Sequence, residues 1–172
     1  MANICSFLMQ ARGDEADLHA LQWLLERGRN GNNVYGDVIL AFELVFPGDV
    51  VGREKTGHPI LAPDLGHTFL WIHDRGFPPM ASIEGNVLRL SGESKWLAPA
   101  DFMARLSMEF PGLDFLLSGT TEHEHVEVLQ AKGGGTFVCR EEYLKDPLDD
   151  QEREWHVRDG LVLDTGYELR YS

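Results

Sequence analysis

The chain lacks any long hydrophobic run. One of its longest apolar stretches, Val38–Phe46, is interrupted by Glu43 and is much too short to cross a membrane as a helix. The N-terminus also lacks a basic region followed by a small-residue cleavage site, so we expect no signal peptide. These absences predict a cytoplasmic protein that has no membrane partner.

Cysteine is scarce as well. Only Cys5 and Cys139 occur, far apart and within apolar, strand-like sequence. Two buried thiols in a reducing compartment are the simplest interpretation. A chain of this length needs no disulfide or metal for its core, because folding buries about 70% of the unfolded surface. We therefore expect one domain over residues 1–172, with an insertion or long loop at about residues 47–79.

Basic residues are few. The sequence has 15 Lys and Arg against 28 Asp and Glu, which gives a net charge of −13. Binding to nucleic acid relies on clustered Lys and Arg that neutralise phosphates. The charge therefore argues against a nucleic-acid partner. It is typical of an acidic, well-solvated surface, with a docking surface for a basic protein as the alternative.

The N-terminal third of the chain predicts a strand, a helix and a second strand. Residues 3–12 alternate well enough for a strand that is covered on both faces at its start. Asp14 is a suitable N-cap for a helix, and Gly28 is a suitable residue to follow its end. Three leucines recur at helical spacing between them, namely Leu18, Leu21 and Leu25. Val38–Phe46 then predicts a strand, with a buried helix as the alternative.

The middle of the chain predicts a long connection followed by a hairpin. Residues 47–66 are rich in Gly and Pro and indicate a long loop, which is uncommon in compact domains and often functional. Residues 67–73 predict a short strand or helix. Glu84-Gly-Asn86 is a good turn between strands over residues 80–83 and 87–94.

A second helix and strand follow this hairpin. Pro99 is favoured at the start of a helix because its missing N–H would have no intrahelical partner there. An apolar stripe is formed by Phe102, Leu106 and Phe110. Pro111-Gly112 ends the helix, and residues 113–117 predict a buried strand.

Two successive strand–helix–strand units predict an α+β fold of the ferredoxin-like type. This split βαβ arrangement is an antiparallel sheet with both helices on one face. The later segments predict antiparallel extensions of that sheet at the C-terminal end of the chain, over residues 122–130, 137–140, 155–157 and 161–171.

Two of these segments resemble the YubB-like ferredoxin-like family, domains of unknown function in bacterial, plasmid and phage proteins. Met1-Ala-Asn-Ile-Cys5 resembles the family's Asn-Trp-Cys opening, with Ile4 where Trp is usual. Trp96 and Pro99, followed by Phe110-Pro111, resemble its Trp-x-x-Pro helix and Phe-Pro stop. The resemblance implies a bacterial ferredoxin-like domain. Its motif residues are structural, so it implies no activity, and two cysteines alone hold no iron–sulfur cluster.

His123, His125 and Glu127 form the best candidate site in the sequence. Alternate residues of a strand share a face, so two imidazoles and a carboxylate would project together. Such a set suits a divalent transition metal. Glu122 and Glu124 would point to the other face, so the segment is polar almost throughout. A solvated edge strand is the alternative explanation.

Other polar and aromatic residues give weaker signals. Several lie in or near the predicted loop, namely His58, His67, His73 and Asp74, and a metal or acid–base pair is conceivable there, although no spacing requires one. Lys132-Gly-Gly-Gly-Thr136 is not a phosphate loop, because its lysine precedes the glycines and a strand follows. The tryptophans Trp71, Trp96 and Trp155 are expected to be anchors in the core or at its rim rather than ligand platforms.

The sequence contains no recognisable catalytic motif, neither Gly-x-Ser-x-Gly nor a dinucleotide fingerprint. We therefore expect a non-enzymatic domain without a cofactor that binds another protein or a second copy of itself, since open sheets need their edges or second face covered. The alternative is a metal-dependent enzyme or metal-binding protein that uses His123, His125 and Glu127. A third hypothesis is a small-molecule binder with its pocket beneath the insertion at residues 47–79.

Overall fold

A computed structural model describes residues 4–73, 78–121, 125–132, 136–143, 146–158 and 161–170, with side chains described up to Thr120. The helices of this part are α1 (Glu15–Glu26), α2 (Phe42–Val45), α3 (Ala100–Glu109) and the short 3-10 helix η1 (Pro47–Asp49). None of the described helices combines the length and hydropathy needed to cross a membrane.

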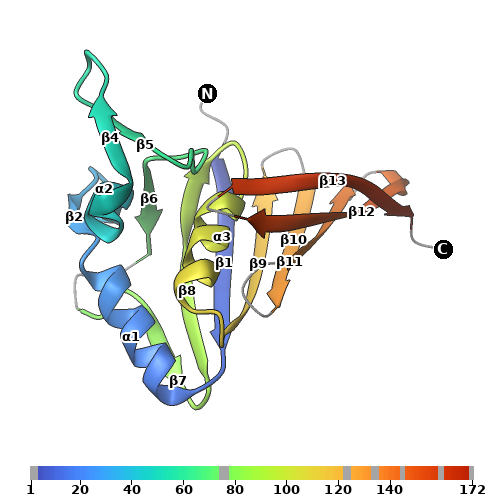
Figure 1. The fold of residues 1–172 in the computed structure, drawn as a ribbon, viewed down its shortest axis with the longest axis horizontal. Helices are drawn as coiled ribbons and strands as arrows, with labels where there is room; N and C mark the ends of the chain where they lie inside the picture. Colours follow the sequence, from blue (N-terminus) through green and yellow to red (C-terminus); the bar gives the residue numbers. More distant parts are fainter. Residues whose placement is uncertain are drawn as a thin grey trace.

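The strands form one large sheet and one small one (Figure 1). The large sheet has the order β13-β12-β11-β10-β9-β1-β8-β6-β3-β2, with β7 beside β8, and its ladders are antiparallel. Its strands are β1 (Ile4–Arg12), β2 (Arg29–Asn32), β3 (Val38–Ala41), β6 (Phe69–Ile72), β7 (Ser82–Glu84), β8 (Val87–Lys95), β9 (Asp114–Thr121), β10 (His125–Lys132), β11 (Thr136–Tyr143), β12 (Asp146–Arg158) and β13 (Leu161–Arg170). The small sheet pairs β4 (Val50–Arg53) with β5 (Pro59–Leu61). The predicted α+β class with an antiparallel sheet is confirmed, and the sheet is larger than the predicted four-stranded core.

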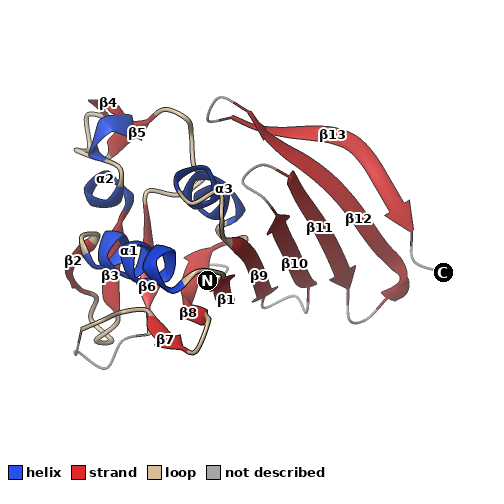
Figure 2. Cartoon of the chain, turned by 60° about the horizontal axis from the view of Figure 1, so that its bottom comes forward, coloured by secondary structure: helices blue, strands red, loops and turns tan. Residues whose placement is uncertain are grey.

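The helices lie on one side of the central strands. Figure 2 shows α1 and α3 on the same side of β1, β6 and β8. Alternate residues of β1 and β8 are buried beneath them, as the alternation of both strands requires. The remaining residues of these strands, together with Phe69 and Trp71 of β6, face away from the helices. We call this side of the sheet the open face.

Aromatic packing joins α2 to α3. The ring of Phe42 stacks on that of Phe102, with centroids 4.1 Å apart and planes 3° from parallel. Phe46 meets Phe102 edge-on at 6.1 Å. The predicted strand over Val38–Phe46 is therefore wrong in its second half, because β3 ends at Ala41 and α2 begins. Burial of Phe42 against α3 outweighs the β propensity of the segment.

The predicted loop over residues 47–66 contains regular structure. After η1, strands β4 and β5 form a hairpin, which projects at the upper left of Figure 1. An ion pair fastens the start of this segment to α3, since Arg105 Nε lies 2.8 Å from Asp49 Oδ2. The same guanidinium lies 4.2 Å from the centre of the Phe46 ring. The prediction of a loop is therefore wrong for this part of the insertion, which contains η1, β4 and β5. Local composition did not reveal the tertiary contacts of Arg105.

Gly28 follows α1 for a reason other than the predicted one. Glycine after a helix often adopts a left-handed backbone, but Gly28 is not among the residues with positive φ. An added Cβ would instead lie 2.3 Å from Leu40 Cδ1 and 2.5 Å from Val45 Cγ2. The glycine is therefore needed for space between the end of α1 and the segment β3–α2.

A second glycine allows β6 to approach β8 closely. Ile72 pairs with Gly92, and Trp71 pairs with Glu93. A Cβ added at Gly92 would lie 2.1 Å from the carbonyl oxygen of Trp71 and 3.1 Å from the Cα of Ile72. Glycine within a strand often marks such a close approach of another backbone. This contact brings the residues of β6 on the open face beside those of β8.

We expect Gly92→Ala to lower the free energy of unfolding by about 1–3 kcal/mol, because the added methyl group forces two backbones apart. Urea denaturation measures the change. Gly52→Ala is the matched control, since its added Cβ meets only Ile60 Cδ1 at 3.8 Å. Equal effects of the two substitutions would contradict the close approach of β6 and β8.

Candidate functional site

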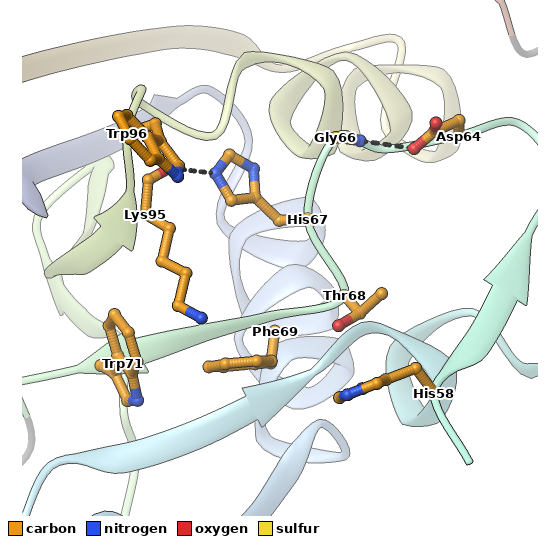
Figure 3. Close-up of a pocket in the computed structure, with 9 residues that line it drawn as sticks. All are labelled: His58, Asp64, Gly66, His67, Thr68, Phe69, Trp71, Lys95 and Trp96. Carbon is orange, nitrogen blue, oxygen red and sulfur yellow. Dashed lines mark hydrogen bonds between the residues drawn. The ribbon is translucent and has the colours of Figure 1, made fainter. Parts of the chain in front are cut away.

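A cavity of about 350 Å³ lies where the insertion, β6 and the end of β8 meet (Figure 3). We call it the aromatic pocket. The residues that define it are Phe69, Trp71, Lys95 and Trp96, with His58 and His67 beside them. Its volume falls in the range of small-molecule sites, which is roughly 300–1,000 Å³. The position matches the third hypothesis from the sequence, a pocket beneath the insertion.

Trp96 is held in a strained backbone conformation at this pocket. Its φ of 70° is the only positive value of a non-glycine residue in the described part of the chain. The N–H of Leu97 donates to the carbonyl of Lys95 at 2.9 Å, which closes a three-residue turn around Trp96. The indole is nevertheless 62% exposed. A strained residue with an exposed aromatic ring is a reason to suspect function, because strain of this kind gathers at binding sites.

Two side chains hold this turn in place. Ser94 Oγ–H donates to the carbonyl of Leu97 at 2.7 Å. His67 Nε2 lies 2.9 Å from the carbonyl oxygen of Lys95. A carbonyl only accepts, so Nε2 carries the proton of this hydrogen bond. The turn is thus tied to the insertion as well as to its own strand.

The second ring nitrogen of His67 is left without a partner. Among the described residues, its Nδ1 is the buried side-chain polar atom that makes no hydrogen bond. In the neutral ring this nitrogen is an acceptor, since the other nitrogen carries the proton. Buried polar atoms are usually satisfied by protein or ordered water, so this unpaired nitrogen is a departure from the rule in a residue that lines the pocket.

An aromatic wall forms the lower side of the pocket in Figure 3. Phe69 and Trp71 meet edge to face, with centroids 5.3 Å apart and planes 75° apart. Both residues lie on the open face of β6 and are half-buried. This wall, together with the indole of Trp96, offers flat apolar surface to a ring.

The side chain of Lys95 extends between Trp96 and this wall. Figure 3 shows its ammonium group pointing towards Phe69 and Trp71. No carboxylate within the described residues forms an ion pair with it. The lower part of the pocket therefore presents a positive charge beside aromatic rings.

One carboxylate, Asp64, lines the pocket at the opposite end, and Asp101 at the start of α3 lies near it without lining the pocket. Asp64 Oδ1 accepts the N–H of Gly66 at 2.9 Å. The pKa of Asp101 is raised, first because burial disfavours its charged form and then because Asp64 lies nearby, while His67 acts in the opposite sense. The pocket is thus polarised, with the carboxylate of Asp64 at the helix end and an ammonium group at the sheet.

The predicted set of His123, His125 and Glu127 lies outside the side chains that the structure describes, and His123 lies outside the described backbone. His125 and Glu127 occupy alternate positions of β10, opposite Tyr143 and Glu141 of β11. The proposed edge strand is wrong for these residues, because β10 lies between β9 and β11. The C-terminal strands continue the sheet past it. The metal hypothesis for this set stays a prediction.

The histidines near the predicted loop separate into two places. His58 and His67 line the aromatic pocket. His73 follows β6 and lies 3.5 Å from Glu93, measured from Nε2 to Oε1. Asp74 lies outside the described residues. The structure therefore brings two of these histidines together, as the weaker hypothesis allowed, without forming an acid–base pair between them.

Sequence reasoning missed Lys95 and assigned Trp96 only an anchoring role. The predicted strand over residues 87–94 ended one residue before Lys95, which is the last residue of β8, and nothing in its neighbours marks it as a ligand-facing residue. A positive φ at a tryptophan also has no sequence signal, since glycine and asparagine are the usual residues there. The aromatic residues at alternate positions of β6 were the available hint.

Comparisons of the chain with models of protein families, with curated proteins and with solved structures found no match.

We expect Trp96→Gly to be more stable than Trp96→Ala by roughly 1 kcal/mol, because glycine adopts positive φ without the steric cost of a Cβ. Urea denaturation of the two variants measures the difference. Leu97 is the control position, since it is also exposed but has no positive φ. There alanine should be at least as stable as glycine, and the same order at both positions would contradict the strain at Trp96.

Proposed function

We propose that this protein binds a small anion that carries a planar ring, in the aromatic pocket. The observation that carries the proposal is the Lys95 ammonium group, which has no carboxylate partner among the described residues and lies beside Phe69 and Trp71. An ammonium group attracts an anion, and the aromatic wall favours a ring by stacking or edge-on contact.

The shape of the pocket supports a ligand of modest size. A volume of about 350 Å³ is at the small end of the range for ligand sites. The hydrogen-bonded turn fixes the backbone of Trp96 before any ligand arrives, which reduces the ordering that binding requires. The carboxylate at the far end, Asp64, disfavours a second negative charge there. We therefore infer a ligand with one anionic group, placed at Lys95.

We also infer that the core of the sheet is ferredoxin-like and that the chain is related to the YubB-like family. The strand order β9-β1-β8-β6 supports the first inference, together with α1 after β1 and α3 between β8 and β9. This is the order that two interleaved βαβ units produce. The added strands β2, β3 and β10–β13 would then be extensions at both ends of that core.

Self-association is a second candidate function, as the sequence suggested. The open face supports it, because no described helix covers that side of β1 and β9 (Figure 2). Leu8 of β1 and Leu116 of β9 lie on this face, and Leu116 is 39% exposed. A second copy of the chain would cover these residues. A protein partner of another kind would do the same.

Isothermal titration with ring carboxylates such as benzoate, and with ring amines of equal size, tests the pocket. We expect carboxylates to bind and amines not to bind. Lys95→Met should weaken carboxylate binding roughly tenfold, which corresponds to about 1.4 kcal/mol. Lys95→Glu should reverse the preference towards amines.

Arg89→Met is the matched control for the Lys95 variants. It removes another cation from the same strand and the same face, about 20 Å away at the usual rise of a strand. Its binding should equal that of the original protein. The proposal fails if no ring anion binds at millimolar concentration, or if both variants weaken binding equally.

For self-association, we expect sedimentation to show dimers at high micromolar concentration and Leu116→Lys to return the protein to monomers. A charge placed in an apolar interface opposes its burial. Leu44→Lys is the control, because Leu44 is equally exposed but lies on α2. A purely monomeric protein at that concentration would remove this candidate.

A further inference from the structure

Three potential metal ligands from neighbouring strands converge on the open face. Asp37 precedes β3, His73 follows β6, and Glu93 lies in β8. The register places Val38 opposite Ile72 and Trp71 opposite Glu93, so the three residues lie close across adjacent ladders. We call them the Asp37–His73–Glu93 trio. Of the three, only His73 was among the residues that the sequence singled out, and Asp37 and Glu93 were not.

The distances within the trio suit a common ion. One ligand atom from each residue lies within 4.8 Å of the other two. His73 Nε2 is 3.5 Å from Glu93 Oε1. Ligand atoms bound at about 2.1 Å to one tetrahedral or octahedral ion are roughly 3.0–3.5 Å apart. Small rotations of these side chains, of which His73 is exposed, would therefore complete the coordination.

The negative charge of the trio favours binding of a cation. Asp37 and Glu93 bring two carboxylates together, and neither forms an ion pair with Lys or Arg in the part of the chain that is described. The imidazole of His73 lies 3.5 Å from Glu93 and is the basic group of the trio. An exposed His–Glu pair contributes little by itself, about 0–1 kcal/mol. A divalent ion would neutralise both carboxylates at once.

The surroundings hold Asp37 in place for this role. The side-chain amide of Asn33 donates to Asp37 Oδ2 at 3.2 Å, and the N–H of Asp37 donates to Asn33 Oδ1 at 2.9 Å. Hydrogen bonds of this kind orient ligands from behind in known metal sites. The second carboxylate oxygen of Asp37 has no hydrogen-bond partner among the described residues.

We propose that the Asp37–His73–Glu93 trio binds a divalent transition-metal ion. One imidazole nitrogen with two carboxylate oxygens suits zinc or manganese, whereas magnesium prefers oxygen ligands alone. Three protein ligands leave at least one position of the ion for water or another molecule. Trp71 is the cross-strand partner of Glu93 and lines the aromatic pocket, so the trio lies next to a residue of that pocket.

Calorimetric titration of the metal-free, untagged protein with zinc chloride tests the site without any ring ligand. We expect one zinc ion per chain, tighter binding of zinc and manganese than of magnesium, and at least a roughly tenfold loss of zinc affinity in His73→Ala and in Glu93→Gln. Unchanged thermal unfolding of the metal-free variants shows that both fold.

Two control variants decide where a bound metal sits. His19→Ala removes the exposed His19–Glu15 pair of α1, which has a similar separation of 3.6 Å but no third ligand in the described residues, and should change nothing. The double variant His123→Ala/His125→Ala should also bind zinc normally. Loss of binding in that double variant with retention in His73→Ala would overturn the proposal, as would the absence of zinc binding to the original protein.

Discussion

The close approach of β6 to β8 is the constraint on which both candidate sites depend. Gly92 leaves no side chain between the two backbones, so Trp71 lies directly opposite Glu93. One consequence is the aromatic pocket, where residues of β6 meet the end of β8. The other is the trio on the same open face, where His73 reaches Glu93. A wider separation of these strands would dismantle both.

Local sequence was sufficient for the elements whose signals are local. The helix α1 begins after Asp14 as its capping pattern indicates, and its leucines are buried. The hairpin β7–β8 turns at Gly85, whose φ of 61° needs the glycine. Proline ahead of α3 and Pro111 after it bound that helix as expected. Each of these features is determined within a few residues, so periodicity and turn chemistry predict them.

Features that depend on distant contacts were missed or, like α2, left open as an alternative. The helix α2 exists because Phe42 packs on Phe102, which is 60 positions later in the chain. The ordered start of the insertion depends on Arg105, and the pocket on three separate segments. Asp37 and Glu93 carry no motif, since only the sheet register brings them to His73. Potential metal ligands were identified where they lie close in sequence, as in His123, His125 and Glu127. They were missed where only the fold brings them together, as in Asp37 and Glu93.

The placement of the tryptophans has an optical consequence. Of the four in the chain, Trp71 and Trp96 border the same cavity. The emission of an exposed indole moves to shorter wavelength when an apolar group covers it, and Trp96 is largely bare. A ligand that binds in the cavity and covers Trp96 would therefore shift the tryptophan emission of the protein to shorter wavelength. The intrinsic fluorescence of Trp96, the residue with the positive φ, would thus report whether the pocket is occupied.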